Sequence, residues 1–315
     1  MKKLAFLVLI ILAVGFTALY YLIPDTLVVT EGAGINCVAD AAFRSISDEQ
    51  SWNKWWPINN DKNNPATTGK LFQVGKNQYT LTKKFINNFE ITIASSKGPV
   101  SSEMNILTIP HDSSFIRWQV IIPAGSNPFR RIAAYYGALS LKKDMHTILG
   151  RLQSYLSDFK NVYGFSYHEA SIKDTLLIIT KSFSPDYPTT GFVYSLVNKL
   201  RDFNNKQGPS VTGIPMLNIT KRTPSGYGVM VALPVNRPVQ QKDSVSMIKM
   251  VPGKFIITDV TGGLKTVEQA HQQIQYYFQD YRRVSMAIPF EYLITDRQKE
   301  TDTSKWVTRI YSPVY

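Results

Sequence analysis

The sequence predicts an α+β protein of two soluble units that follow an N-terminal transmembrane helix. Three observations support this prediction. An apolar run opens the chain, a strand-rich stretch that ends in a long amphipathic segment follows it, and the second half repeats one order of strand, helix, strand and strand. The 315 residues suffice for two ordinary domains and an attachment segment. We expect the anchor at 1–25, the first domain at 26–159 and the second at 160–315.

The apolar run covers residues 4–23 and follows Lys2 and Lys3. Twenty residues at a rise of about 1.5 Å match a hydrocarbon core of about 30 Å. Tyr20 and Tyr21 lie where an interfacial aromatic belt is expected. Positive residues precede the run, which predicts a cytoplasmic N-terminus. We therefore expect a single-pass protein of the bacterial inner membrane, with its soluble domains on the outer side.

A cleaved signal peptide is the alternative interpretation of the same run. The segment Ala13-Val14-Gly15 has the small-x-small pattern of a cleavage site. The apolar run continues for eight residues beyond that segment, which a cleaved signal does not need. The pattern therefore favours an uncleaved anchor.

The composition favours a globular protein near an anionic membrane surface. Of the residues, 44% are hydrophobic and 18% are charged, and the net charge of +12 is spread without a run of five like charges. No basic stripe with interleaved aromatic residues occurs, so we expect no nucleic-acid partner.

Cysteine and histidine spacing predicts neither a disulfide nor a metal site. Cys37 is the single cysteine, and the four histidines show no metal-ligand spacing among themselves. Glu268 and His271 form one Glu-x-x-His pair, whereas a carboxylate-bridged metal site in a helical bundle needs two. We interpret this pair as exposed on a helix, and we expect no metal ion and no cofactor.

The first unit combines a strand, short helical segments, a meander and a long helix. The chain turns helical at Ala39 and reaches "WNKWWP" at 52–57. Strand-like runs at 78–95, 101–110 and 114–123 are separated by turn signals, which predicts an antiparallel meander. Asn127-Pro128 marks the start of the long helix. Its predicted apolar face consists of Ile132, Tyr135, Leu139, Ile148, Leu152, Tyr155 and Phe159.

This order of elements, with the "WNKWWP" segment, resembles the START-like or polyketide-cyclase fold of the SRPBCC superfamily. The resemblance implies a helix-grip domain in which a curved sheet wraps around a long helix and often encloses an apolar cavity. Such a cavity would suit a carrier of lipids or other apolar ligands. The alternative is that Trp52, Trp55, Trp56 and Trp118 fill a core.

The second unit repeats a β-α-β-β plan. The first copy has strands at 175–180, 213–220 and 228–235, and the second has strands at 251–260, 287–295 and 305–314. Each copy has a helix after its first strand, and Thr266 with Gln269 predicts a capping box in the second helix. Val193 lies 22 residues before Pro215, and Val267 lies 22 residues before Pro289. Such self-similarity predicts two pseudo-symmetric copies of one unit.

The segments "VPGKFIITDVTGG", "IPFEYLITD" and "RIYSPV" of the second copy resemble the GyrI-like small-molecule-binding domain. This domain is also the effector-binding half of AraC- and MerR-type regulators. The resemblance implies a groove between the two copies for amphipathic, often cationic aromatic molecules. It also implies that a glutamate in the Pro-x-Glu position meets the positive charge of the ligand, and here that residue is Glu291.

Glu291 is also unusual on physical grounds, because a charge inside an apolar strand needs a partner, a proton or a ligand. The first copy has Leu217 at the equivalent place, so the fold itself does not require the charge. We expect a ligand site made of Glu291 and nearby rings, namely Phe290, Tyr292, Tyr277, Trp306 and Tyr311. The alternative is a structural salt bridge to Arg309 or Arg282.

The sequence therefore predicts a membrane-anchored small-molecule-binding protein. A hydrolase that uses Glu291 as general base is a second hypothesis, because some GyrI-like relatives open reactive rings. The sequence shows no helix-turn-helix, nucleophile elbow, phosphate loop or second catalytic group at a fixed spacing, so an enzyme is the less favoured class. The ligand, the coupling of the two domains and the oligomeric state do not follow from these patterns.

Overall fold

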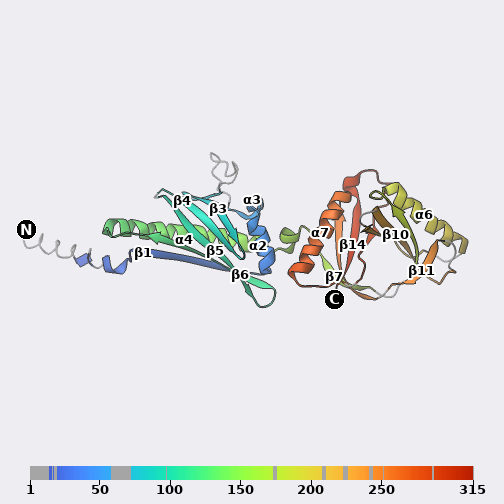
Figure 1. Cartoon of the computed structure of the whole chain (residues 1–315), viewed down its shortest axis with the longest axis horizontal. Helices are drawn as coiled ribbons and strands as arrows, with labels where there is room; N and C mark the ends of the chain where they lie inside the picture. The colour runs from blue at the N-terminus through green and yellow to red at the C-terminus, as the bar shows by residue number, and fades with distance from the viewer. Residues whose placement is uncertain are drawn as a thin grey trace, which may run out of the picture. The chain divides into compact units, whose positions relative to one another are not determined.

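A computed structural model describes residues 14–15, 17, 20–57, 72–96, 98–172, 176–207, 211–222, 226–240, 244–250, 252–285 and 287–314. The chain forms two compact units, Met1–Asp158 and Phe159–Tyr315 (Figure 1). Most of the predicted transmembrane helix lies outside the described residues, as does Ala13 of the alternative cleavage site. In the part of the chain that is described, no helix is both long and apolar enough to cross a membrane.

Unit 1 contains one antiparallel sheet with strand order β1-β6-β5-β4-β3-β2. The predicted meander is therefore present, and the first strand closes it by pairing with the last. The strands are β1 (Thr26–Ile35), β2 (Phe72–Val74), β3 (Asn77–Phe85), β4 (Asn88–Ser95), β5 (Gly98–Ile109) and β6 (Ser113–Pro123). The helices are α2 (Ala39–Ser47), α3 (Trp52–Trp55) and α4 (Pro128–Leu156).

The long helix α4 begins where the sequence predicts, because the side chain of Asn127 accepts hydrogen bonds from the backbone N–H groups of Phe129 and Arg130. Its predicted apolar face is wrong in the first three turns, where Tyr135 and Leu139 are exposed. In these turns, Arg131, Ala134 and Ala138 occupy the buried face of the helix. The buried residues of α4 are Arg131, Ala134, Ala138, Leu141, Met145, Ile148, Leu149, Leu152 and Leu156.

Aromatic rings fill the core of unit 1 beside α3. Trp52 stacks on Trp56 with ring centroids 5.1 Å apart, and Trp56 lies 5.4 Å from Tyr79. Trp118 is fully buried and donates its indole hydrogen to Ser102 Oγ at 3.0 Å. This packing is the one expected if the tryptophans belong to a core, which was the alternative to a ligand cavity.

Unit 2 contains one antiparallel sheet with strand order β11-β8-β10-β9-β13-β14-β12-β7. The order is symmetric about the β9–β13 pair, as two β-α-β-β copies require. The first copy consists of β8 (Leu176–Ser184), α6 (Thr190–Gln207), β9 (Met216–Arg222) and β10 (Gly226–Val235). The second consists of β12 (Gly253–Thr261), α7 (Leu264–Asp280), β13 (Phe290–Leu293) and β14 (Val307–Val314).

The two copies also exchange their leading strands, which the sequence did not predict. β7 (His168–Ile172) precedes the first copy but pairs with β12 of the second. β11 (Val245–Lys249) precedes the second copy but pairs with β8 of the first. Each copy therefore provides the outermost strand on the other copy's side of the sheet. The short helix α5 (Phe159–Tyr163) packs against α7.

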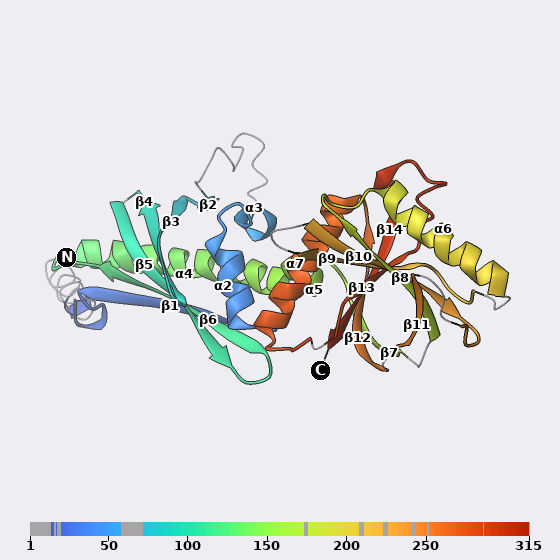
Figure 2. The same ribbon diagram turned by 45° about the vertical axis from the view of Figure 1, so that its right-hand side comes forward.

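Each long helix of unit 2 covers the half of the sheet that belongs to its own copy (Figure 2). Val197 and Leu200 of α6 are fully buried against Leu217 of β9 and its neighbours. The opposite face of the sheet packs Leu177, Phe255, Phe290 and others into a second cluster. β13 thus presents alternate side chains to two different environments.

The start of α7 differs from the predicted capping box. Gly263 is the N-cap, it provides no side-chain cap, and Thr266 lies inside the helix. The turn depends instead on Gly262, whose φ of +135° lies in a region that favours glycine. A Cβ atom at Gly262 would lie 2.7 Å from Thr266 Oγ1, whereas the nearest atom to one at Gly263 would be 3.6 Å away.

We expect Gly262→Ala to destabilise α7 by about 1–3 kcal/mol, because alanine cannot adopt this backbone conformation without strain. Hydrogen–deuterium exchange of peptides from 264–280 measures the effect. Gly263→Ala is the matched control and should change exchange much less, since its backbone suits any residue. Equal effects of the two substitutions would contradict the assigned role of Gly262.

Candidate functional site

A cavity of about 410 Å³ lies on the helix-covered face of the unit 2 sheet, where the two copies meet. Its walls come from the segment before α6, from β9, β10 and β13, and from one face of α7. The lining residues are Tyr187, Leu217, Asn218, Ile219, Lys221, Tyr227, Glu268, His271, Pro289, Phe290 and Glu291.

Glu291 is the buried carboxylate of this cavity, with 9% of its surface exposed. It lies in β13 directly opposite Leu217 of β9, so it belongs to the seam between the copies. Its Oε1 atom lies 2.9 Å from Nε2 of His271 on α7. One such bond leaves the carboxylate with lone pairs that can accept from a ligand.

The salt bridge to Arg309, which was part of the alternative interpretation of Glu291, does not form. Arg309 instead binds Asp259 through two hydrogen bonds of 2.6 and 2.9 Å. These bonds raise the pKa of Arg309 and lower that of Asp259. The partner of Glu291 is therefore a histidine from a helix and not an arginine from the adjacent strand.

His271 and Glu268 were predicted to be an exposed pair on a helix, and that interpretation is wrong for His271. Its side chain is 32% exposed, and both residues line the cavity. The Glu-x-x-His spacing was a usable signal, because residues three apart share one face of a helix. The sequence does not reveal that this face turns toward Glu291.

The rings predicted to surround Glu291 divide among three environments. Phe290 lines the cavity and stacks on Tyr311 with ring centroids 4.8 Å apart. Tyr311 and Tyr292 belong with it to the cluster on the other face of the sheet. Tyr277 faces another part of unit 2, where it packs on Phe159 and neighbouring tyrosines. Tyr292, Tyr311 and Tyr277 are thus outside the cavity lining.

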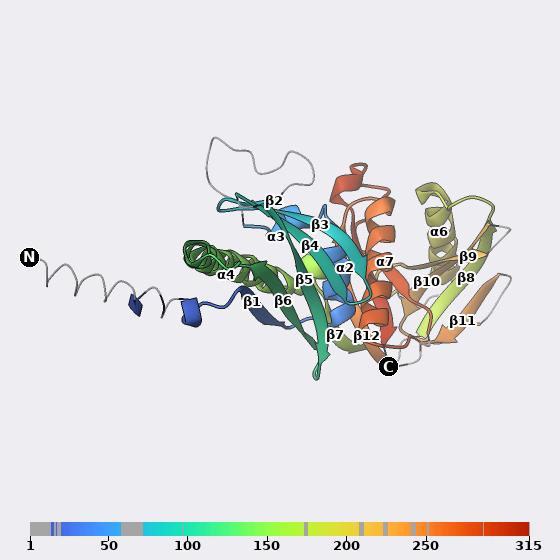
Figure 3. The same cartoon turned by 60° about the vertical axis from the view of Figure 1, so that its left-hand side comes forward.

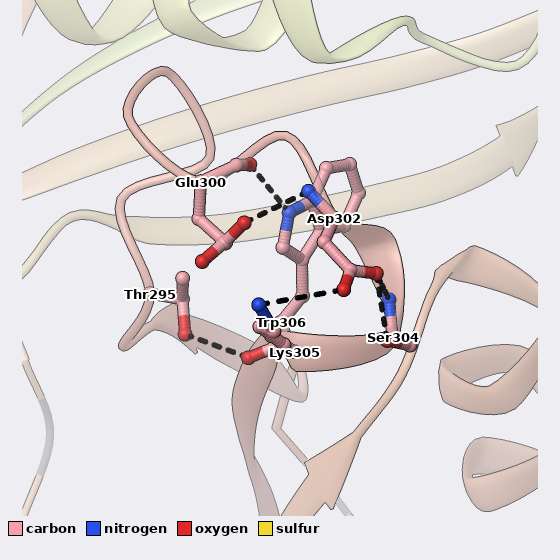
Figure 4. Close-up of polar contacts among 6 residues, drawn as sticks. All are labelled: Thr295, Glu300, Asp302, Ser304, Lys305 and Trp306. Atoms are coloured by element: carbon pink, nitrogen blue, oxygen red, sulfur yellow. Dashed lines mark hydrogen bonds and ion pairs between the residues drawn. The ribbon is translucent and has the colours of Figure 1, made fainter.

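Trp306 is also outside the lining, because the loop before β14 holds it (Figure 4). Its indole N–H donates to the carbonyl oxygen of Glu300 at 2.9 Å. The guanidinium of Arg297 lies 4.8 Å from the centre of its ring. Burial lowers the pKa of Arg297, and the negative charge of Glu291 partly offsets that change. Trp306 therefore stabilises a buried cation that lies within electrostatic range of the site.

Two cavity rings were missed by the sequence analysis, Tyr187 and Tyr227. They come from the segment before α6 and from β10, and they form an edge-to-face pair with centroids 5.4 Å apart. The pKa of Tyr187 is raised to about 12, first by burial and then by the negative charges of Glu291 and Glu268. The rings and the two carboxylates thus share one electrostatic environment.

Among the described residues, no group of three or more histidine, cysteine, aspartate or glutamate side chains is arranged to hold a metal ion. The cavity combines two carboxylates, one imidazole, one lysine and several rings. Such a set can bind a polar or charged organic molecule through ion pairing and ring contacts.

No family model matches the chain, and no curated protein matches it. Similar solved structures include the C-terminal domain of EcmrR, with 15% identity and a TM-score of 0.43, covering 48% of this chain and 98% of that one. SAV2435 bound to tetraphenylphosphonium has 17% identity, a TM-score of 0.31 and coverages of 48% and 94%. A hydrolase from Listeria innocua has 10% identity, a TM-score of 0.36 and coverages of 48% and 92%. At these identities the likeness concerns the fold alone.

We expect Glu291→Gln to lower the pKa of Tyr187 from about 12. Of the two carboxylates that raise this pKa, Glu291 has the larger effect. Glu268→Gln should lower that pKa by less. Tyrosine-selective ¹³C NMR measures both titrations. Tyr292 is the control, since its raised pKa comes from burial and Tyr311, and it should not respond. If neither substitution changes the pKa of Tyr187, the geometry given for the cavity is contradicted.

Proposed function

We propose that this protein is a membrane-anchored small-molecule-binding protein whose second unit binds amphipathic aromatic cations. One observation carries the proposal, namely the buried Glu291 carboxylate in the lining of a cavity that also contains aromatic rings, between two β-α-β-β copies. A partly desolvated carboxylate favours a counter-ion, and the cation can gain further attraction from aromatic faces. The resemblance of the second copy to GyrI-like domains supports the same proposal.

The preference for cations comes from the local groups and opposes the net charge of the chain. Glu291 and Glu268 contribute two negative charges, and Tyr187, Tyr227 and Phe290 contribute rings. Lys221 lines the cavity as well, and its ammonium would disfavour a cation nearby. The carboxylates therefore have to dominate at the binding position, and this makes Glu291 the decisive residue.

The membrane part of the proposal rests on residues 4–23 and the charges that flank them. An anchor in the bacterial inner membrane would place both units on the outer side. The buried tryptophans of unit 1 favour a filled core, so we assign the ligand to unit 2 and not to a lipid-carrying cavity in unit 1.

The hydrolase hypothesis has one supporting observation, the contact between His271 and Glu291. A glutamate that is hydrogen-bonded to a histidine could act as a general base and take a proton from a bound water. Binding needs only the carboxylate and the rings, whereas hydrolysis also needs a group that stabilises the developing charge. We therefore propose binding as the function and keep hydrolysis as the alternative.

We expect Glu291→Gln to weaken binding of tetraphenylphosphonium by about tenfold or more, which corresponds to about 1.4 kcal/mol. Calorimetry on the detergent-solubilised full chain, with a micelle blank, measures the affinity. Glu90→Gln is the matched control, because it removes the same charge from an ion pair with Lys83 in unit 1. The uncharged compound triphenylphosphine oxide should bind Glu291→Gln and Glu90→Gln with equal affinity. An unchanged affinity of Glu291→Gln for the cation would refute the counter-ion role.

A further inference from the structure

The first three turns of α4 expose an apolar face that water does not favour. Phe129 is 65% exposed, Tyr136 is 67% exposed and Leu139 is 47% exposed. Their spacing of seven and three residues places them on one side of the helix, away from the buried residues Ala134 and Ala138. A helix that packs one face on a sheet normally presents polar residues on the other.

This exposure is confined to the beginning of the helix. After Leu139 the exposed positions of α4 are polar or charged, as expected for a solvated face. They are Ser140, Lys142, Lys143, His146, Thr147, Arg151, Gln153 and Ser154. The apolar face therefore belongs to one end of unit 1 and is not a property of the whole helix.

That end of unit 1 is also where the N-terminal apolar run joins it. The first residue of β1, Thr26, pairs with the last residue of β6, Pro123, and α4 begins five residues after Pro123. Figures 1 and 3 show the first turns of α4 beside the beginning of β1. The exposed face therefore lies near residues 20–23, which end the apolar run.

Arg131 fixes this arrangement through a buried guanidinium group. Its Nη1 atom donates to the carbonyl oxygens of Tyr20 at 2.8 Å and Ile23 at 2.9 Å, and its Nε donates to Gly125 at 2.8 Å. The guanidinium carbon lies 4.2 Å from the centre of the Tyr20 ring. A cation at the carboxyl end of a helical segment is favourable. The end of the apolar run is thus tied to the first turn of α4.

We propose that Phe129, Tyr136 and Leu139, here called the juxtamembrane face, lie on the surface of the bilayer that holds residues 4–23. The inference rests on the anchor in the proposed function. Aromatic side chains are favoured at the interface between hydrocarbon and water, and the exposed Arg130 beside Phe129 suits anionic headgroups. Continuity with the anchor argues for lipid as the occupant, because the Arg131 bonds hold this face where the chain would enter the membrane.

The consequence is that unit 1 is held against the membrane and does not swing freely on a tether. The anchor and the juxtamembrane face give two separated contacts with one bilayer, and two contacts restrict rotation more than one.

The test uses a fluorescent label on the full chain in phospholipid nanodiscs with one chain per disc. Cys37 is the single cysteine and is buried, so Cys37→Ser provides a background for labelling. The environment-sensitive dye NBD is attached at Tyr136→Cys, at Phe129→Cys, or at Ile86→Cys. Ile86 is 93% exposed in the turn between β3 and β4, and it serves as the matched exposed apolar control.

We expect blue-shifted emission at positions 136 and 129, with strong quenching by lipids that carry a spin label near the headgroup. The label at position 86 should show neither effect. Labels at 136 and 129 that behave like the one at 86, in a chain that stays with the lipid, would overturn the juxtamembrane face and leave the anchor intact. A blue shift without lipid quenching would overturn it in favour of a contact with another part of the same chain. A chain that does not associate with lipid would overturn both the face and the anchor.

Discussion

The pairing of β9 with β13 is the constraint on which the site of unit 2 depends. This seam joins the two copies through few bonds, among them Leu293 N–H to Pro215 O at 3.1 Å and the side-chain amide of Asn218 to Pro289 O at 2.8 Å. It places Glu291 directly opposite Leu217. These two residues occupy equivalent places in the repeat, so the pseudo-symmetry axis passes between a carboxylate and an isobutyl group. A symmetric fold thereby produces an asymmetric cavity.

The asymmetry extends to the helix residues that face the seam. An offset of 74 residues relates Val193 to Val267 and Pro215 to Pro289, and the same offset relates Val197 to His271. In the first copy, Val197 and Leu217 are buried in one apolar cluster. In the second copy, His271 and Glu291 form a hydrogen bond at the corresponding place. The replacement of an apolar pair by a polar pair keeps the buried carboxylate satisfied, since a lone change to glutamate would leave it without a partner.

Much of this architecture follows from local patterns, and its errors have identifiable physical causes. The meander of unit 1 and the two β-α-β-β copies were predicted because alternation and turn residues act over short distances. The exchange of β7 and β11 was not, because strand partners across a sheet are chosen by tertiary packing. The face of α4 was misassigned because aromatic residues such as Tyr135 were expected to be buried, whereas alanines allow closer packing on the sheet. At the site, Glu291 was predicted from its charge within an apolar strand and from the resemblance to GyrI-like domains, but its partner His271 depends on how α7 is rotated.

The positive net charge of the chain is compatible with the proposed binding of cations in the cavity, because charge interactions weaken with distance. At physiological ionic strength, charges further apart than about 8 Å are largely screened, so most of the lysines and arginines act weakly on a ligand in the cavity. In the proposed complex, Glu291 would act on the ligand at contact distance and in partly desolvated surroundings, where a single charge interacts far more strongly. A nearby anionic bilayer, attracted by the same positive surface, would also concentrate amphipathic cations. In the proposed function, the basic exterior would help to keep the protein at the membrane, and the carboxylates of one cavity would select the ligand that it binds there.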